Sequence, residues 1–455
     1  MGQLVAIQTQ KEAEDMIYRS YLRAVDHITE KLDERVRRPE LTRKLLEMVG
    51  APDQGQKFIL VTGSKGKGST SRLISSLLSH MGYKVGLFTS PHLFHFNERI
   101  RVDGKAITED DFIRLSNKIQ PAFEKIEAEL PPYDYQGPIG VALTVAVLYF
   151  QEKRTDFNVI ECGRGGTYDD TNVLSNNWAV ITPILEEHVH NIGPTLTDIT
   201  KHKFGIVKEE TSHIYIGEQR DRVKDQLKAL LKASGKVASF YGDQFSAHNR
   251  MISSRGTEFS VQTTQGCYEN LKLLILGEFQ AVNASLALQL CSEIKGEKLD
   301  EKTVCQCFSN LQWPGRCEII NEQPTIIVDG AIHRDSAKFL KNIIQAINKS
   351  GDKKITSIIS VPEDKDYDGV IQVMSSVSDQ LIVTKPDISH LKFPDEAVEV
   401  ANKYKAGSQE FENLGEAVRQ AIQDNPSGVI LIVGTQTLIG NAKRLFGQSL
   451  FDIGK

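Results

Sequence analysis

Short apolar runs rich in β-branched residues alternate with stretches of helical periodicity along much of the chain. In the first half the runs are FILVT, KVGLFT, FNVIE, AVITPI and HIYIG. Strands of this kind, separated by helices, are typical of a parallel sheet that helices cover on both faces. Residues 12–50 precede the first run with helical periodicity, which Gly50 and Pro52 end. The pattern predicts an α/β fold with a mostly parallel sheet.

The pattern changes twice further along the chain. Between Val237 and Leu276, polar and apolar residues alternate, which predicts a small antiparallel β insertion. A helical stretch follows from Ala281, and apolar runs resume after WPGR as TIIVD, ITSIIS, QLIVT and VILIVG. We therefore place a domain boundary near Gln312. It predicts a larger N-terminal α/β domain of residues 1–311 and a smaller, Rossmann-like α/β domain of residues 312–455.

Composition narrows the classes of protein to consider. The 455 residues are 40% hydrophobic and 25% charged, as in ordinary globular proteins. The net charge of -5 and the sequence pI of about 6.2 argue against a nucleic-acid partner. No apolar run approaches the roughly 18 residues of a membrane span, and the first residues lack the apolar core of a signal peptide. We expect a cytoplasmic protein without membrane or nucleic-acid partners, with its six scattered cysteines reduced.

The segment VTGSKGKGST, residues 61–70, carries the first chemical signal. It joins an apolar strand to a helix, and its glycines let backbone amides and the helix N-terminus surround an anion. Lys67 is predicted to reach the terminal phosphates of a nucleotide, and the Ser69 hydroxyl to ligate magnesium. A flexible Gly/Ser loop is the alternative, but the order strand, lysine, hydroxyl, helix favours phosphate binding. The predicted phosphate-binding residues are Gly63, Ser64, Lys65, Gly66, Lys67, Gly68, Ser69 and Thr70.

The spacing differs from G-x-x-x-x-G-K-[ST], because a glycine separates the lysine from the serine. It resembles the GTNGKGS of folylpolyglutamate and dihydrofolate synthases, relatives of the Mur peptidoglycan ligases, with Ser64 and Lys65 replacing Thr and Asn. Residues 88–104, FTSPHLFHFNERIRVDG, resemble the TSPHL and NERI segments of the same family. The resemblance runs from about Leu41 to Phe446. It implies an ATP-dependent ligase that joins a substrate carboxylate to an amino-acid amine and releases ADP and phosphate.

The resemblance also implies a magnesium site. NVIECGRGGTYDDTNVL resembles E-x-G-x-G-G-R-x-D-A-T-N, and Glu161 ends a predicted buried strand, where open α/β sheets present ligands. The family implies that Ser69, Ser90, Glu161 and His188 ligate two magnesium ions. Taken alone, His188 is more often a core or surface residue than a ligand. Lys203 matches a lysine that is typically carbamylated in the family, so the resemblance makes Lys67, His188 and Lys203 the catalytic residues.

The second half of the chain supplies the rest of the implied nucleotide site. GEFQAVNASLAL, residues 277–288, resembles G-x-H-Q-x-x-N-A and implies that Asn283 contacts adenine. WPGRCEII supplies Arg316, implied to bridge the two domains to the phosphates, a role that suits its planar fork. Asp329 keeps a position that helps hold ATP. The family's His-Asn-Pro triplet is Ile332, His333 and Arg334 here, so neither His333 nor Arg334 inherits a role.

The sequence leaves the substrate open. Phosphorylating a carboxylate brings two anions together, which the predicted lysine and magnesium would offset. Thr167 replaces a family arginine, and GPIGVALTVAVLYF lacks the family's T-x-F-E element. Three functions therefore stay open. The chain extends a folate-type carboxylate with glutamate, joins a different carboxylate to another amino acid or amine, or is a P-loop NTPase without ligase activity. Small-molecule substrates and a monomer or small homo-oligomer are expected.

Overall fold

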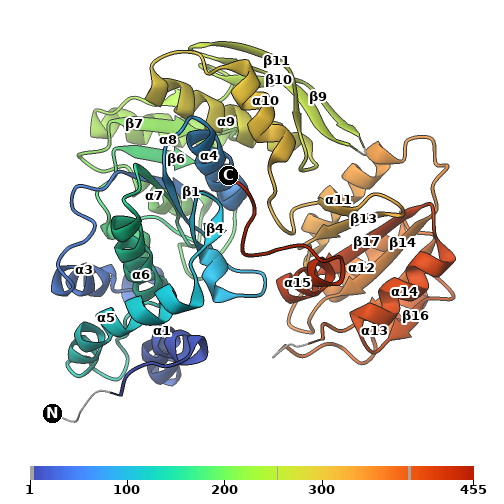
Figure 1. Cartoon of the computed structure of the whole chain (residues 1–455), viewed down its shortest axis with the longest axis horizontal. Coiled ribbons are helices and arrows are strands. Elements are labelled where there is room, and N and C mark those ends of the chain that lie inside the picture. Colours follow the sequence, from blue (N-terminus) through green and yellow to red (C-terminus); the bar gives the residue numbers. More distant parts are fainter. Residues whose placement is uncertain (1–4, 254, 388–390) are drawn as a thin grey trace.

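The computed structural model describes residues 5–253, 255–387 and 391–455. It has two lobes, and the polypeptide crosses between them near residue 312 (Figure 1). The larger lobe contains an eight-stranded and a three-stranded sheet, and the smaller lobe contains a six-stranded sheet. The predicted mixed α/β class, with a mostly parallel first sheet and a second α/β unit, is confirmed. The division into domains at residue 312 stays our proposal.

The large sheet has the order β4-β3-β2-β5-β1-β6-β7-β8. Only the β2–β3 and β3–β4 pairs of this described sheet are antiparallel, and the other pairs are parallel. Its central strands are buried on both faces, which explains their continuous apolar runs. The strands are β1 (Phe58–Thr62), β2 (Val85–Phe88), β3 (Ile100–Val102), β4 (Lys105–Ala106), β5 (Phe157–Glu161), β6 (Trp178–Ile181), β7 (His213–Ile216) and β8 (Ser239–Phe240).

Helices cover both faces of this sheet. One face packs against α1 (Gln10–Ala24), α3 (Pro39–Met48), α5 (Glu109–Glu127), α6 (Pro138–Lys153), α7 (Leu196–Phe204) and α8 (Asp221–Ser234). The other face packs against α4 (Lys67–His80), α9 (Glu278–Lys295) and α10 (Glu301–Asn310). Short helical turns connect several of these elements: η1 (Val25–His27), α2 (Asp33–Val36), η2 (Phe96–Arg99) and η3 (Asp170–Val173). The phosphate loop thus begins a helix that is sandwiched between the sheet and α9.

The predicted β insertion is an antiparallel three-stranded sheet in the order β11-β10-β9. Its strands are β9 (Ser246–Ser253), β10 (Gly256–Thr263) and β11 (Gly266–Leu273). Its inner face joins the same apolar core as α4, α9 and α10, through side chains such as Phe259 and Leu271. The insertion therefore supports the layer of helices next to the phosphate loop.

The smaller lobe has the strand order β12-β13-β17-β14-β15-β16, with all pairs parallel except β12–β13. One face packs against α11 (Arg334–Ile347), α12 (Tyr367–Ser375) and α13 (Ala397–Tyr404), and the other against α14 (Leu414–Asp424) and α15 (Gln436–Leu445). The strands are β12 (Glu318–Asn321), β13 (Thr325–Asp329), β14 (Ile355–Ser360), β15 (Gln380–Thr384), β16 (Gln409–Phe411) and β17 (Val429–Gly434).

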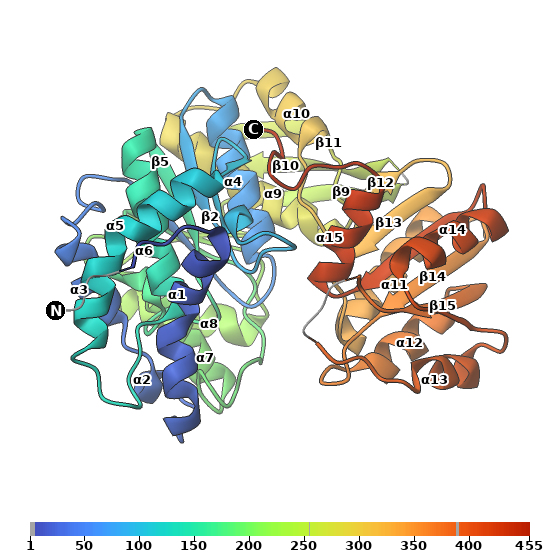
Figure 2. The ribbon, with the colours of Figure 1, turned by 60° about the horizontal axis from the view of Figure 1, so that its bottom comes forward.

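After α15 the chain returns to the larger lobe, so the last residues lie beside α4 (Figures 1 and 2). Two polypeptide crossings therefore connect the lobes. Within the described ranges, no helix has both the length and the apolar character that crossing a bilayer requires.

Candidate active site

The phosphate loop has the conformation that its glycines predict. It follows β1, and α4 begins at Lys67. Gly63 has φ +139° and Gly66 has φ +85°, in a region that side chains with a β-carbon rarely adopt. Lys67 Nζ donates to the Gly63 carbonyl at 3.0 Å. No side chain among the described residues caps the N-terminus of α4, so its first amides are available to an anion.

Glu161 and Ser90 meet beside this loop. Glu161 ends β5, in register with Val61 on β1, and is almost fully buried. Its Oε2 atom accepts a hydrogen bond from the Ser90 amide at 3.0 Å. A β-carbon placed on Gly68 would lie 3.4 Å from both Glu161 carboxylate oxygens. Burial raises the pKa of Glu161, and the Lys67 charge opposes that shift. The structure thus brings together residues from three separate motifs.

These residues face a cleft of about 530 Å³ between the lobes. Arg316 is exposed at this cleft and forms no salt bridge or hydrogen bond within the described residues. The Trp313 ring covers Gly68, since a β-carbon there would lie 3.3 Å from Trp313. The cleft is lined by Gly68, Thr89, Ser90, Pro91, His92, Leu93, Glu98, Arg101, Glu161, Trp313, Pro314, Gly315, Arg316 and Gln436.

Lys203 lies at the base of the phosphate loop. It is fully buried on α7, and its Nζ donates to the carbonyls of Gly63 and Arg164, each at 2.8 Å, and to Glu187 Oε1 at 3.4 Å. Burial, reinforced by the neighbouring Lys67 charge, lowers the pKa of Lys203 to about 8. The Gly63 carbonyl therefore accepts from both lysines that the sequence singled out.

His188 occupies the loop after β6 with a positive φ of +51°. Partial burial lowers its pKa, with Glu187 opposing and with Arg164, Lys203 and Lys67 adding to the decrease. Lys67 thus exerts its charge on both Glu161 and His188. These two residues, predicted as metal ligands, are thus both close enough to Lys67 to feel its charge.

The donor set fits magnesium rather than zinc. The part of the chain that the structure describes has no group of three or more His, Cys, Asp or Glu residues arranged to hold a metal. Magnesium commonly uses only one or two carboxylates, with water and substrate phosphates completing its shell. Glu161 accepts only a backbone amide within that part of the chain, so its remaining lone pairs suit this role. The hydroxyls of Ser69 and Ser90 add oxygen donors of the preferred type.

Asn283 and Asp329 take more local contacts than the sequence indicated. Asn283 Nδ2 donates to Gln280 Oε1 at 3.0 Å, and Asn283 Oδ1 lies 2.8 Å from where a Gly66 β-carbon would be. Asn283 thus packs against the phosphate loop. Asp329 Oδ2 accepts from the Cys317 amide at 3.0 Å and from its thiol at 3.1 Å. Asp329 therefore fixes the residue that follows Arg316.

Comparisons with known proteins show the family of the chain. A family model for the Mur ligase middle domain matches residues 61–291, and one for the Mur ligase glutamate ligase domain matches residues 315–436. The chain belongs to the Mur ligase family. It is similar to the dihydrofolate synthase/folylpolyglutamate synthase of Bacillus subtilis, at 27% identity over 386 residues, 83% of this chain and 88% of the relative. Relatives of this kind make it an ATP-dependent ligase of the Mur family.

Solved structures extend the likeness to the whole chain. A Mycobacterium tuberculosis folylpolyglutamate synthase complexed with ADP has a TM-score of 0.80 and 26% identity, covering 97% of this chain and 99% of that one. A folylpolyglutamate synthase complex with AMPPCP and folate has a TM-score of 0.75 and 25% identity, covering 96% and 99%. ATP is therefore the nucleotide that this Mur ligase uses.

Several residues of this Mur ligase differ from the family pattern, and they lie outside the cleft lining. Arg334 approaches Asp366 and Asp368 at 4.0 and 3.8 Å on the surface of the small lobe. Ile332 packs against the apolar core of that lobe. Thr167 Oγ1 donates to the His202 carbonyl at 3.1 Å. Arg334, Ile332 and Thr167 thus contact other parts of their own lobe, at positions where the family pattern has residues of the His-Asn-Pro triplet and an arginine.

Residues 88–104, which resemble the family, also contribute His92, Glu98 and Arg101 to the cleft lining, although the sequence assigned none of them a role of its own. Arg99 Nε donates to His92 Nδ1 at 2.9 Å, which leaves the ring's other nitrogen as its donor. Glu98 accepts from the amides of Leu93, Phe94 and His95 and so shapes the loop after Ser90. Both belong to segments that resemble the family. In the sequence, the only sign that His92 and Glu98 belong to the site was their place in a loop that Pro91 interrupts.

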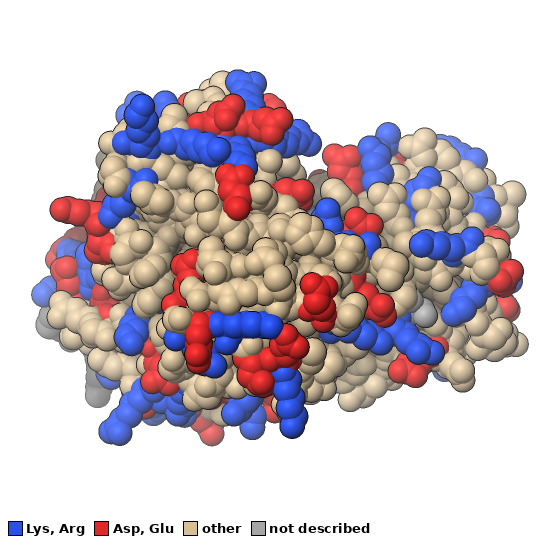
Figure 3. Space-filling view, turned by 90° about the horizontal axis from the view of Figure 1, so that it is seen from above, with Lys and Arg blue, Asp and Glu red and all other residues tan. Residues whose placement is uncertain are grey.

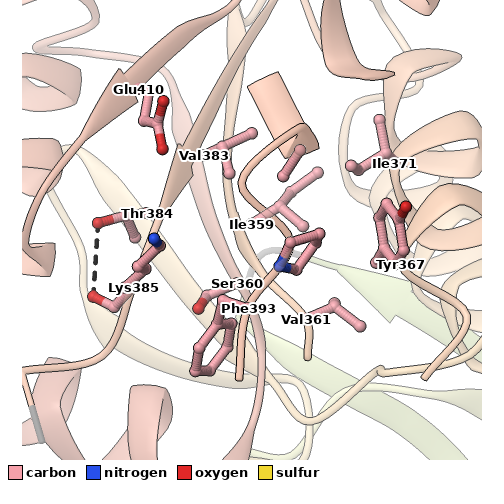
Figure 4. Close-up of a pocket in the computed structure, with 12 residues that line it drawn as sticks. Ile359, Ser360, Val361, Tyr367, Ile371, Val383, Thr384, Lys385, Phe393 and Glu410 are labelled. Atoms are coloured by element: carbon pink, nitrogen blue, oxygen red, sulfur yellow. Dashed lines mark hydrogen bonds between the residues drawn. The ribbon is translucent and has the colours of Figure 1, made fainter. Parts of the chain in front are cut away.

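A second cavity of about 300 Å³ lies in the small lobe, at the carboxyl ends of β14 and β15 (Figure 4). Lys385, Glu410 and Tyr367 are among its lining residues, and Thr384 Oγ1 lies 3.5 Å from the Lys385 carbonyl. None of the predicted site residues lines this cavity.

Proposed function

We propose that this chain activates a folate-type carboxylate as an acyl phosphate and joins it to the amine of glutamate. The observation that carries the proposal is the grouping of Gly68, Ser90, Glu161 and Arg316 around one interdomain cleft. The names of the relatives support folate as the carboxylate, and the complex with AMPPCP and folate supports it further. The products would be ADP, phosphate and the amide.

In the first step, a substrate carboxylate oxygen attacks the γ-phosphorus of ATP, and ADP leaves. The ammonium of Lys67 and the free amides of α4 hold the phosphates and offset the repulsion between the two anions. We propose that Arg316, which lines the cleft from the opposite lobe, binds the same phosphates. Magnesium, held by Ser69, Ser90 and Glu161, would supply further charge neutralisation, and we propose His188 as ligand of a second ion.

In the second step, the amine nitrogen attacks the acyl carbon, phosphate leaves, and the nitrogen releases a proton. No side-chain nucleophile is needed. We propose that the Trp313 ring, which lies over Gly68, helps to shield the acyl phosphate from water. The chain's contribution is therefore positioning and charge.

We propose that Lys203 is carbamylated in the active enzyme. Carbamylation needs the neutral amine, and a pKa near 8 makes that form available at neutral to mildly basic pH. In its unmodified form the ammonium donates to three oxygens, which compete with the modification. We expect ¹³C-bicarbonate to give a carbamate signal in the NMR spectrum of the wild type and none in Lys203→Arg. Identical spectra would exclude the modification.

A non-folate carboxylate is the second candidate. It is favoured by Thr167, which replaces a family arginine, and by the altered residues 332–334, which take structural contacts. A panel of carboxylates and amines, with phosphate release and product mass measured together, separates the candidates. ATP hydrolysis that depends on neither partner would favour an NTPase without ligase activity, and AMP with pyrophosphate would exclude the acyl phosphate route.

The site makes one prediction directly. We expect Lys67→Ala and Glu161→Ala each to reduce turnover by at least about 100-fold while melting close to the wild type, because both belong to the phosphate and metal set. Lys232→Ala, which removes an exposed cation from α8 and touches none of the candidate site residues, is the matched control. Melting temperatures far below the wild type in both variants would mark the residues as structural.

We also propose a cytoplasmic enzyme with small-molecule substrates, as a monomer or small homo-oligomer. On the face shown in Figure 3, acidic and basic side chains are interspersed. Such a surface offers no extended basic patch to a nucleic acid on that face.

A further inference from the structure

The turn that carries Arg316 is held from both sides. The Arg316 guanidinium makes no hydrogen bond or ion pair within the described residues, and its Nη1 lies 3.3 Å from the place of a Gly330 β-carbon. Gly315 and Cys317 are buried, whereas Arg316 between them is exposed. Cys317 has φ +49°, and both its amide and its thiol donate to Asp329. On the other side, the Gly330 amide donates to the Gly315 carbonyl at 3.2 Å. The backbone around Arg316 is thereby fixed to β13.

A buried ion pair completes this support. Glu318 Oε2 accepts from the Gly315 amide at 3.1 Å, and Glu318 Oε1 accepts from Lys443 Nζ. Lys443 is fully buried on α15, and Glu318 is 8% exposed. A buried ion pair is often a poorer stabiliser than apolar residues of the same size. Here both carboxylate oxygens are used, one for the charge and one to hold the turn.

We infer that Glu318 and Lys443 are positioning residues that aim Arg316 across the cleft at the phosphates of the bound nucleotide. Both lie in the small lobe, while Gly68 and Glu161 lie in the large one. The turn of Arg316 is therefore tied to β12, β13 and α15 of the small lobe. This inference rests on the proposed function, since it takes the cleft as the ATP site.

A double-mutant cycle on nucleotide affinity tests the inference without any knowledge of the carboxylate. The probe is Mg·AMPPCP, and its Kd is measured by titration calorimetry. Glu318→Gln removes the negative charge and replaces one acceptor oxygen with an NH₂ donor. That donor faces either the Lys443 ammonium or the Gly315 amide N–H, so one of the two hydrogen bonds is lost. We expect it to weaken binding by about tenfold, as for a lost hydrogen bond to a charged group. In an Arg316→Ala background, where there is no guanidinium to aim, we expect less than about a twofold further loss.

Two further variants keep the result interpretable. The pair E318Q/K443Q restores an uncharged hydrogen-bonded contact and should bind within about threefold of the wild type. Lys224→Gln breaks a surface pair with Asp243, at 2.7 Å, and is the matched control that should change nothing. Melting curves monitor the fold. If Glu318→Gln does not fold, Lys443→Gln takes its place in the same cycle.

An equal loss of affinity with and without Arg316 would overturn the inference, because a general structural defect acts in both backgrounds. Unchanged affinity in Glu318→Gln would overturn it as well. A wild type that binds Mg·AMPPCP but forms no amide with the carboxylate panel would instead defeat only the proposed function. The two failures are therefore distinguishable.

Discussion

The surroundings of the His202 ring disfavour its charged form. Its Nδ1 atom accepts from the Gly166 amide at 3.1 Å, and its Nε2 atom is buried without a partner among the described residues. Gly165 is close enough that a β-carbon there would lie 2.5 Å from the ring. A proton on Nδ1 would face the Gly166 N–H and break the hydrogen bond. Burial accordingly lowers the pKa of His202.

This lowered pKa predicts a pH-dependent stability. The folded state binds the His202 proton less tightly than the unfolded chain, whose histidine pKa is about 6.5, so stability is present above that pH and is lost as the pH falls through it. We expect the melting temperature of His202→Gln to fall less than that of the wild type between about pH 7.5 and 5.5, by roughly 2 °C. Parallel pH profiles would contradict the assignment.

The exposed His27 gives the matched control. His27→Gln should keep the full pH dependence of the wild type, because its ring has no buried environment to lose. Other histidines with lowered pKa, such as His92 and His95, remain in both variants and contribute equally. The difference between profiles therefore isolates His202.

At the scale of elements, the phosphate loop depends on close contact between two strand ends. A β-carbon on Gly63 would lie 2.0 Å from Thr182 Oγ1 and 2.9 Å from the Thr182 carbonyl oxygen, and its φ is +139°. We expect Gly63→Ala to lower the melting temperature and to weaken Mg·AMPPCP binding by more than about tenfold, because the loop must move away from β6. Calorimetry and melting curves measure both effects.

Gly242→Ala is the control for this change. It also has a positive φ, of +86°, but nothing lies within 4 Å of the place that a β-carbon would occupy. It should cost only the backbone strain of about 1 kcal/mol and leave nucleotide binding unchanged. Equal losses of binding in the two variants would show that the contact with Thr182 is unimportant.

The elements that the sequence predicted are those with strong local patterns. FILVT, FNVIE, TIIVD and VILIVG are buried parallel strands, and their continuous apolar runs made them recognisable. The short edge strand QEF has no such pattern, because its residues are exposed or only partly buried. The antiparallel strand β3 was also not predicted. Its three residues lie within residues 88–104, which were interpreted only as a family motif.

The candidate site was predictable to the extent that motifs carried it. Lys67, Ser90 and Glu161 could be placed because each stands at a strand end or a glycine-rich turn, and the family resemblance joined them. The Glu318–Lys443 pair could not be found in this way, because its members are 125 positions apart and neither lies in a motif of polar residues. That Asp329 holds ATP stays a prediction. Its contact with Cys317 could not be predicted, because it depends on the conformation of the turn around Arg316.

At the scale of the whole molecule, residues 449–455 tie the small lobe back to the large one. Arg72 on α4 donates through Nη2 to the carbonyls of Ile453, Gly454 and Lys455, at 2.9–3.1 Å. Its Nε donates to the Gln312 carbonyl at 3.1 Å. Both crossings between the lobes therefore meet at one buried arginine, five positions beyond Lys67. Burial lowers the pKa of Arg72 to about 10.

A second arginine holds the same segment. Arg101 Nη2 donates to the Leu450 carbonyl at 2.7 Å, and Arg101 Nη1 donates to the Phe451 carbonyl at 3.1 Å. Arg101 is 2% exposed and also lines the cleft. Deleting residues 449–455 would leave two buried guanidinium groups without these acceptors. Buried donors without partners cost about 1–3 kcal/mol each, and charged ones more.

We therefore expect the deletion to lower the free energy of unfolding of the large lobe by about 2–5 kcal/mol. Amide hydrogen exchange should also become faster in α4, because that helix loses the contacts of Arg72 and of Ser76, whose hydroxyl donates to the Lys455 carbonyl at 2.8 Å. Gly104→Ala tests the docking without removing any chain, since its β-carbon would lie 1.7 Å from the Gly454 carbonyl oxygen. Gly55→Ala, with the same φ of +79° as Gly104 and open space around it, is the matched control outside α4. If Gly104→Ala exchanged in α4 no faster than Gly55→Ala, the docked segment would have no part in holding the helix that begins at the phosphate loop.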